Sequence, residues 1–542
     1  MASAKAPSRR YKSRDFCGLY SVFTISAGLV FPLALAFSSS RHITAVCLEV
    51  FQGYLYLVSI GYLIYVFLHY LHVKDPEKPR QVAYHENKVH LDHADKDEDG
   101  FSNGATSSKE SPKKSVASGE EELPAVHYGG EGLTLYLRIG AIIFGFGGFL
   151  YDILKIIEFG TEVSRGCKPS TNIVSTVINP IFVIVQTYFI FRFHKIVVTK
   201  KKGLANFGFS HVAATNACVF VAYSILDTED DFRESLKETA DNSTPNECSR
   251  LQSLFDRASP FLYPCVLEYS IIGAALMYTI YKSIGEPPED EFERQERERD
   301  KQLKSRALKD HVPSVIGGIL GLGVGLVTVI MITIYMVVFE DSDTGNDVIG
   351  VDIIASLDIL LLALAGISVI IGFVWMKDLK YMGMEIDTLD DNLLLVSTAG
   401  VFVNGLFLLL SVVSSIGEAE TSTVIPILFL CVMGMTQATA QFVFITDSSR
   451  RVPDVKTPYS THAAHRRGRG LIVFLMACNL CIWAVNTLAV KRVEKITIFN
   501  DFYGTLPWMI LYNLTVPVVI FFRFHSAAVL AISWKNAFVK KD

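Results

Sequence analysis

Residues 313–338 read PSVIGGILGLGVGLVTVIMITIYMVV and contain no charged side chain. A helix rises about 1.5 Å per residue, so about 20 apolar residues are enough to cross the hydrocarbon core of a bilayer. Further runs of this kind are separated by charged stretches, and 50% of the 542 residues are hydrophobic. The chain is therefore predicted to be a polytopic membrane protein.

The glycines of this segment are closely spaced. Gly317, Gly321 and Gly325 recur at every fourth position. A phosphate-binding loop needs a preceding strand and an aqueous approach, and neither is expected inside a span. The spacing suits close packing against another helix in lipid, which is what we predict.

Twelve membrane-spanning segments are predicted in all. A transmembrane barrel would show segments of about ten residues with alternating polarity, and the sequence lacks them. The fold class is therefore all-α. The expected spans are 16–38, 44–72, 133–156, 172–194, 207–225, 259–282, 313–338, 348–376, 392–415, 424–446, 469–490 and 505–532.

Basic residues in the short flanking segments predict the orientation. Twelve crossings put three basic clusters on one side of the membrane, which marks that side as cytosolic. The opposite side has EDSDTGND (340–347) and GEAETST (417–423), which lack Lys and Arg, although Lys491, Arg492 and Lys495 run against the rule. No cleavage site follows the first span, so we expect a retained signal anchor and both termini in the cytosol. The clusters are Arg9, Arg10, Lys12 and Arg14; Lys200, Lys201 and Lys202; and Arg450, Arg451, Arg466, Arg467 and Arg469.

The predicted outer loop 226–258 supports this orientation. It contains the glycosylation sequon that begins at Asn242, and it also contains Cys248. The other outer loop of the same half has Cys167. A Cys167–Cys248 disulfide and two free thiols are both open alternatives. Asn242 is the expected glycosylation site.

Two polar segments interrupt the spans. Residues 73–132 are too poor in large apolar side chains to fold alone and are predicted to be a disordered cytosolic insert. Residues 286–312 are predicted to be a charged cytosolic linker. DKDEDG (95–100) begins like a calcium-binding loop, but the twelfth position is Thr106 instead of Glu. No metal site is predicted.

The linker separates two six-span halves, residues 1–285 and 313–542, whose sequences are weakly similar to each other. Ala214-Thr-Asn216-Ala-Cys218 in the fifth span has its counterpart in Ala477-Cys-Asn479-Leu-Cys481 in the eleventh. Similar pairs are offset by about 255 to 263 residues, in chain order. Because six spans preserve direction, we predict a parallel repeat of a six-helix unit.

Polar side chains near span centres need a reason, because an unpartnered amide in hydrocarbon costs several kcal/mol. Gln186, Asn216 and Tyr269 each lie within about one turn of the centre of the fourth, fifth and sixth spans. Three neutral groups at one level can form a hydrogen-bonded cluster. Whether they line a path or only join helices is open. The second half offers Gln441, Asn479 and, less well centred, Tyr512.

Ionisable residues within the spans are costly, so they usually line a path that water or protein reaches. Glu268, His211, Asp152 and Asp358 are the candidates for such a path. Desolvation raises the pKa of a carboxyl group towards neutral pH and lowers that of an imidazole, and both kinds of group can exchange protons. Other charged residues lie nearer the inner end, where ion pairing or snorkelling is an equal alternative. These are Asp447, His465, Arg523 and His525.

The sequence indicates conduction and not catalysis. It has no metal-ligand pair at helical spacing, no phosphate cradle and no nucleophile with an evident base. Groups that titrate or hydrogen-bond within the membrane favour a very small permeant ion, and protons fit best. A proton-coupled transporter and a non-conducting scaffold are the alternatives. The net charge of −5 reflects solvated loops and carries little information about partners. No nucleic-acid partner is expected.

Several long stretches, in order, resemble the otopetrin family of proton channels. The resemblance covers most of the spans and fails only in the inserts. It lies in YLRIGAIIFGFG (136–147), FSHVAATNACVF (209–220), LEYSIIGAALMYTIYKSIG (267–285), RRGRGLIVFLMACNLCIWAVNT (466–487) and FYGTLPWMILYNLTVPVVIFFRFHSAAVLAISW (502–534).

The resemblance implies two six-helix halves, a homodimer in the plasma membrane, and a proton-selective conductance that external acid activates and zinc blocks. It also implies contacts with membrane lipids, including a bound sterol or lipid. A Gln-Asn-Tyr constriction in each half would correspond to Gln186, Asn216 and Tyr269, and to Gln441, Asn479 and Tyr512. Glu268 and His211 match functional positions of the family, and Asp447 and His465 match a charged pair at the inner side. Ser210 stands where vertebrate members tend to have methionine, which leaves zinc sensitivity open.

Overall fold

The computed structural model contains twelve helices that are long and apolar enough to span a membrane. This number and the fold class agree with the sequence prediction, and each helix overlaps one predicted span. The structure describes residues 9–38, 41–71, 125–128, 135–164, 173–240, 252–286, 314–340, 347–377, 379–381, 388–417, 421–452, 462–493 and 497–537.

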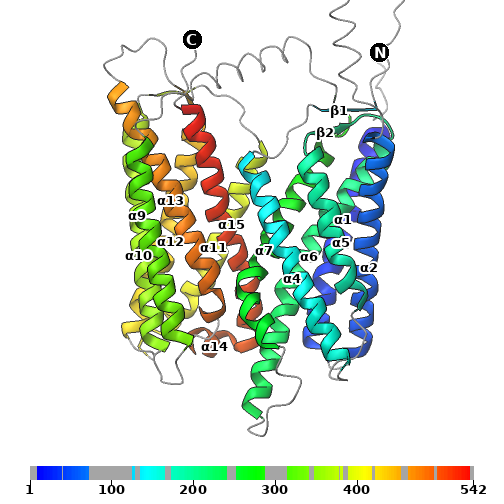
Figure 1. Ribbon diagram of the computed structural model, residues 1–542, viewed down its shortest axis with the longest axis horizontal. Helices are drawn as coiled ribbons and strands as arrows, with labels where there is room; N and C mark the ends of the chain where they lie inside the picture. Colours follow the sequence, from blue (N-terminus) through cyan, green and yellow to red (C-terminus); the bar gives the residue numbers. More distant parts are fainter. Residues whose placement is uncertain are drawn as a thin grey trace, which may run out of the picture.

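The first six spanning helices form one group in Figure 1. A single π-helical turn, η1 (Phe67–Leu71), extends the second of them. Within the group, α6 packs against α1 and α7, α4 packs against α5 and α7, and α2 packs against α5. The helices are α1 (Arg9–Phe37), α2 (Arg41–Val66), α4 (Leu135–Ser164), α5 (Ile173–Phe193), α6 (Lys202–Ala240) and α7 (Gln252–Ser283).

The second six form a neighbouring group, with the short α14 (Thr497–Tyr503) across its end opposite β1 and β2 (Figure 1). Here α13 packs against α9, α10 and α15, α11 packs against α12 and α15, and α10 packs against α12. The helices are α9 (Ser314–Glu340), α10 (Asp347–Met376), α11 (Thr388–Ser414), α12 (Thr421–Ser448), α13 (His462–Val493) and α15 (Thr505–Ala537).

Several helices are longer than the spans that hydropathy predicts. Helix α6 continues to Ala240, and α7 already begins at Gln252, so much of the predicted outer loop 226–258 is helical. Hydropathy identifies only the part of a helix that lies in lipid. Beyond that part each added polar residue still gains a backbone hydrogen bond, so the helix does not stop at the membrane surface.

Two short antiparallel strand pairs were not predicted. In the first, β1 (Val126–Tyr128) pairs with β2 (Ile196–Val198), so the predicted disordered insert 73–132 contains an ordered strand near its end. Val126 and all three residues of β2 are buried, which explains why this part of the polar insert is fixed. In the second pair, β3 (Lys380–Tyr381) lies beside β4 (Arg451–Val452).

The two groups meet along α7, α13 and α15. Helix α15 contacts α4, α6 and α7 of the first group, and α13 contacts α7. The rings of Phe144, Trp483 and Phe524 pack together at this junction, with 4.9 Å between the centroids of Phe144 and Phe524. An aromatic cluster therefore lies at the contact between the groups.

The glycine-rich segment packs as predicted at two of its three positions. A Cβ at Gly317 would lie 1.9 Å from the backbone oxygen of Gly470, and one at Gly321 would lie 2.6 Å from the Cβ of Ala477. Helix α9 therefore contacts α13 backbone to backbone. Nothing lies within 4 Å of a Cβ at Gly325, so the third glycine takes no part in this contact.

Candidate functional site

The amide side chains of Gln186 in α5 and Asn216 in α6 bond to each other. Gln186 Nε2 donates to Asn216 Oδ1 over 2.8 Å, and Asn216 Nδ2 donates to Gln186 Oε1 over 2.7 Å. Asn216 Nδ2 also donates to the backbone oxygen of Val212. A Cβ at Gly273 of α7 would lie 2.5 Å from Asn216 Oδ1, so the glycine lets α7 touch the amides. Three helices meet at this pair.

Tyr269 lies beside the amide pair, close enough to Gln186 to interact with it. Its hydroxyl accepts a hydrogen bond from Thr187 Oγ1 (2.9 Å) and donates to the backbone oxygen of Val183 (3.2 Å). On the other side, a Cβ at Gly145 of α4 would lie 3.0 Å from the tyrosine ring. The structure thus brings the three residues predicted for the first half together in one buried layer.

Asp152 of α4 is buried and fully hydrogen-bonded. Asn179 Nδ2 donates to Asp152 Oδ2, and the Tyr223 hydroxyl donates to Asp152 Oδ1, each over 2.8 Å. Asn179 and Tyr223 also bond to each other at 2.8 Å. Lys155 Nζ lies 5.3 Å from the centroid of the Tyr223 ring. Asp152 therefore joins α4, α5 and α6 through two neutral donors, with a cation nearby.

His211 of α6 is completely buried, and both of its ring nitrogens have partners. Nε2 lies 3.1 Å from the Leu55 backbone oxygen, which can only accept, so Nε2 carries the proton. Nδ1 then accepts from the Tyr20 hydroxyl at 2.5 Å, and Tyr20 lies 2.7 Å from the Tyr54 hydroxyl. These hydroxyls connect the buried imidazole to Tyr54, which is 43% exposed on the outside of the bundle.

Glu268 of α7 lies at the junction of the two groups. Its Oε1 accepts a hydrogen bond from Trp483 Nε1 of α13 at 3.0 Å. Its Oε2 is buried and has no hydrogen-bond partner among the described residues. A carboxyl group of the first half therefore accepts a hydrogen bond from an indole N–H of the second half. Its other oxygen accepts none from the described residues.

The second amide pair is part of a longer chain. Gln441 of α12 and Asn479 of α13 bond reciprocally, at 2.7 and 3.1 Å. Gln437 Nε2 donates to Gln441 Oε1 at 2.9 Å, and Arg523 Nη1 of α15 donates to Gln437 Oε1 at 2.5 Å. Arg523 was expected near the interface, yet it is only 3% exposed. The guanidinium lies inside the bundle and does not snorkel, so of the two alternatives expected for Arg523 the pairing of charges remains.

Asp358 of α10 lies close enough to Arg523 for the two charges to interact. The Oδ1 of Asp358 is buried and without a hydrogen-bond partner in the described part of the chain. Tyr512 lies about 16 Å from Arg523 along the axis of α15. Its ring packs against Trp508, with the ring centroids 5.2 Å apart. The structure therefore places Arg523 at the end of the hydrogen-bonded chain that leads to the second amide pair.

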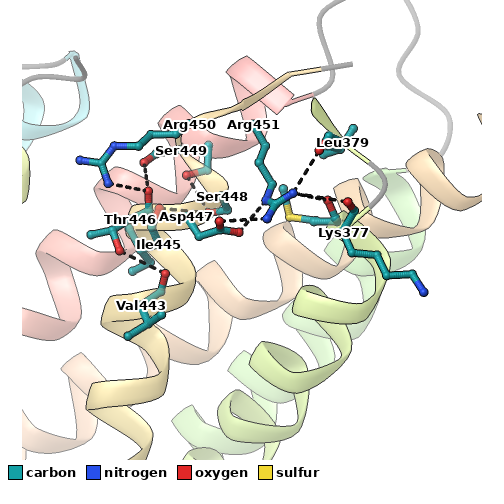
Figure 2. Close-up of polar contacts among 12 residues, drawn as sticks. Lys377, Leu379, Val443, Ile445, Thr446, Asp447, Ser448, Ser449, Arg450 and Arg451 are labelled. Atoms are coloured by element: carbon teal, nitrogen blue, oxygen red, sulfur yellow. Dashed lines mark hydrogen bonds and ion pairs between the residues drawn. The ribbon is translucent and has the colours of Figure 1, made fainter. Parts of the chain in front are cut away.

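Asp447 forms an ion pair near the C-terminal end of α12 (Figure 2). Its Oδ2 lies 2.6 Å from Arg451 Nε and its Oδ1 lies 3.0 Å from Arg451 Nη2. Arg451 Nη1 also donates to the backbone oxygens of Met376, Lys377 and Leu379, so the pair ties α12 to the end of α10. The expected partner, His465, lies in α13, but its side chain is outside the described residues, as are Cys167, Cys248 and Asn242.

His194 follows α5 at the same end of the bundle as β2. It is half-buried, and its Nδ1 has no hydrogen-bond partner among the described residues. Burial, together with the positive charges of Arg138 and Lys195, lowers the pKa of His194 to about 4. The imidazole is therefore uncharged near pH 7. His525 is buried, with Nε2 3.0 Å from the Asp390 backbone oxygen and 3.9 Å from Asp390 Oδ1, so the expected pairing with a carboxyl group stays open.

The sequence prediction missed several partners of the predicted residues. Tyr20, Tyr223 and Trp483 are aromatic and did not stand out as polar, although each hydroxyl or indole N–H needs a partner when buried. Helical spacing could have identified two of the missed residues. Gln437 precedes Gln441 by four positions and Trp483 follows Asn479 by four, so each lies on the same helix face as a predicted residue.

Among the described residues, no group of three or more His, Cys, Asp or Glu side chains could hold a metal ion. Cys478 and Cys481 are buried thiols.

Comparison with known proteins identifies the family. The family model Otopetrin matches residues 136–246 and 231–524. The chain is 26% identical to Proton channel OtopLc of Drosophila melanogaster, over 99% of this chain and 36% of that protein. It is 22% identical to Proton channel OTOP2 of Homo sapiens (73% of this chain, 81% of that protein) and 23% identical to Proton channel OTOP1 of Rattus norvegicus (73% and 77%). With a family model matching most of its length, this multi-pass membrane protein belongs to the otopetrin family.

Proposed function

We propose that the chain is a proton-selective channel of the plasma membrane, which opens when the extracellular side is acidified. The relatives at 22% to 26% identity are named as proton channels, which supports the permeant ion. Protons pass through the bundle by way of water and titrating side chains, while the amide pairs limit the passage of hydrated metal ions. Zinc inhibition and a bound sterol or lipid are further properties that membership of the family suggests.

Glu268 is the observation that carries this proposal. A carboxyl group that served only as one member of an ion pair would have a cation against it, yet the hydrogen bond given to Glu268 comes from a neutral indole. Its second oxygen is buried without a partner among the described residues, so it can take up a proton without breaking an existing bond. Buried ionisable groups in membrane spans are commonly parts of a proton relay.

We also infer a duplicated unit, on the basis of which helices pack together. The α1–α6 contact corresponds to α9–α13, the α2–α5 contact to α10–α12, and the α4–α7 contact to α11–α15. Each group has one reciprocal Gln–Asn pair. We propose that the two groups are parallel repeats. We also propose that both termini lie in the cytosol and that the protein assembles as a homodimer.

Whole-cell recording with a step to acidic external solution tests the function. A proton-selective pore requires the reversal potential to move by about 59 mV per pH unit of gradient. Replacing external sodium by a large organic cation should leave the reversal potential unchanged. A current that appears only with an added solute and saturates with its concentration would favour a proton-coupled transporter.

A further inference from the structure

The two amide pairs have different electrical surroundings. Gln186 and Asn216 bond to each other and to a backbone carbonyl, and their other close neighbours are Gly273 and Tyr269, which are neutral. In the second half a guanidinium lies one residue away from the pair, because Arg523 bonds to Gln437 and Gln437 bonds to Gln441. Only the second pair is thus joined to a fixed positive charge by the hydrogen bonds between described residues.

The arginine also fixes the direction of the whole chain of amides. A guanidinium can donate hydrogen bonds but cannot accept them, so Gln437 must turn its Oε1 towards Arg523. Its Nε2 is then available to donate to Gln441 Oε1, and Gln441 Nε2 donates in turn to Asn479 Oδ1. Each amide is therefore held in one orientation. Asn479 Nδ2 also donates to the Leu475 backbone oxygen, as Asn216 Nδ2 does to that of Val212, so both pairs have a fixed orientation. What distinguishes the second pair is the positive charge at the end of its hydrogen-bonded chain.

The guanidinium keeps its charge even though it is buried, because arginine is not deprotonated in proteins. Arg523 is 3% exposed, and its Nε has no hydrogen-bond partner among the described residues. Asp358 is the opposite charge that interacts with it. The carboxylate lowers the cost of burying the guanidinium, but the guanidinium still faces the amides at hydrogen-bonding distance. An arginine in a pore is a known means of excluding protons and cations.

We propose that Arg523 closes the second half to protons, so that the first half, through the Gln186–Asn216 pair, carries the current. The inference rests on the proposed proton conductance and assigns its route. Arg523 is then a selectivity element, and Asp358 is its counter-ion instead of a relay residue. The two amide pairs have similar geometry and opposite roles.

Neutralising the charged pair tests the proposal in a background where the first half is blocked. Gln186→Leu with Asn216→Leu replaces both amides by apolar groups, which avoids leaving one amide unpaired. We expect the acid-evoked current of this blocked variant to fall about tenfold or more. Adding Asp358→Asn and Arg523→Gln removes both charges together and should restore a substantial proton current, because no fixed positive charge then repels protons from the second amide pair. Adding Arg523→Lys instead keeps the charge and should restore none.

Surface labelling must show that each variant reaches the membrane. The proposal is overturned if the neutralised variant is at the surface and still gives no current, or if the blocked variant keeps wild-type current. Arg523→Met with Asp358→Asn is a second neutral combination for the same blocked background, because methionine is apolar and similar in length to arginine. This variant should also restore current, and its failure to do so at the surface would count against the proposal. The proposed function is tested separately, with the wild-type protein. It fails if the reversal potential of the wild-type current does not change with the proton gradient.

Discussion

The carboxyl group of Glu268 is bonded to Trp483 Nε1 across the junction of α7 and α13. A glutamine at this position has the same size and can still accept from the indole, but it cannot gain or lose a proton. Replacement by glutamine therefore separates the proton-binding role of Glu268 from its role in packing.

We predict that Glu268→Gln reduces the acid-evoked current several-fold or shifts its dependence on external pH. The hydrogen bond to Trp483 is retained, so the protein should reach the surface normally. Recording of current against external pH, normalised to surface protein, measures the effect. Asp501→Asn removes an exposed carboxyl of α14 and is the matched control. A Glu268→Gln curve that overlays the wild-type curve would exclude Glu268 from the path.

The buried imidazole of His211 gives a second prediction. Tyr20→Phe removes the hydroxyl that bonds to His211 Nδ1, so a buried acceptor is left without a partner. This should destabilise the protein by about 1–3 kcal/mol, whereas Tyr54→Phe removes only the exposed end of the chain of hydroxyls and should cost about 0.5–1.5 kcal/mol. Thermal unfolding in detergent should show the larger loss for Tyr20→Phe. Equal losses for the two variants would contradict this ranking.

The sequence identified most of the buried polar residues but not how they are connected. Hydropathy and span counting located Gln186, Asn216 and Tyr269 at one depth, and the structure brings them together. The same count selected Tyr512 for the second cluster, whereas the residue of α15 that bonds to the second amide chain is Arg523. Which of the two faces an amide pair depends on the rotation and depth of α15 relative to α12, and these are fixed by contacts between distant parts of the chain.

At the scale of the helices, close contact depends on individual glycines. Gly317 and Gly470 allow α9 and α13 to touch through their backbones, and Gly28 similarly allows α1 to approach Cys218 of α6, where a Cβ would lie 2.3 Å from the sulfur. Without a hydrophobic driving force between helices in lipid, such contacts contribute through van der Waals packing. The position of α9 is therefore sensitive to one methyl group.

We predict that Gly317→Ala destabilises the protein, because the added Cβ would overlap the Gly470 backbone and force the helices apart. Overpacking of this kind typically costs about 1–3 kcal/mol. Gly325→Ala, on the same helix, meets nothing within 4 Å and should be neutral or stabilising by up to about 1 kcal/mol, since alanine favours helix. Thermal melting and surface yield of the two variants provide the comparison. A neutral Gly317→Ala would show that α9 can move away at little cost.

Helix existence was predictable from the sequence, whereas helix ends were not. Every predicted span is part of a helix, because an apolar run of this length in lipid has no other way to satisfy its backbone. The extension of α6 to Ala240 and the strand at Val126–Tyr128 depend on polar segments, where hydropathy carries no signal. The strand forms because the chain after α5 presents three residues, Ile196–Val198, that become buried against it.

For the whole molecule, the orientation follows from basic residues and can be tested by glycosylation. Asn242 lies between the end of α6 and the start of α7, which the proposed topology puts outside the cell. We predict that removal of N-linked glycans increases the electrophoretic mobility of the wild-type protein expressed in animal cells, and that Asn242→Gln abolishes this shift. Persistence of the shift in Asn242→Gln would mean that another asparagine carries the glycan. A wild-type protein without any shift would leave the topology without this support.

The bond between Trp483 and Glu268 has an optical consequence. The chain has four tryptophans, and the indole N–H of this one points at an ionisable group. Because indole fluorescence responds to the charge of a hydrogen-bonded neighbour, the emission of Trp483 should report whether Glu268 is occupied by a proton. A protein that retains Trp483 and has phenylalanine at the other three tryptophan positions would thus carry its own spectroscopic probe, readable in purified material without electrodes.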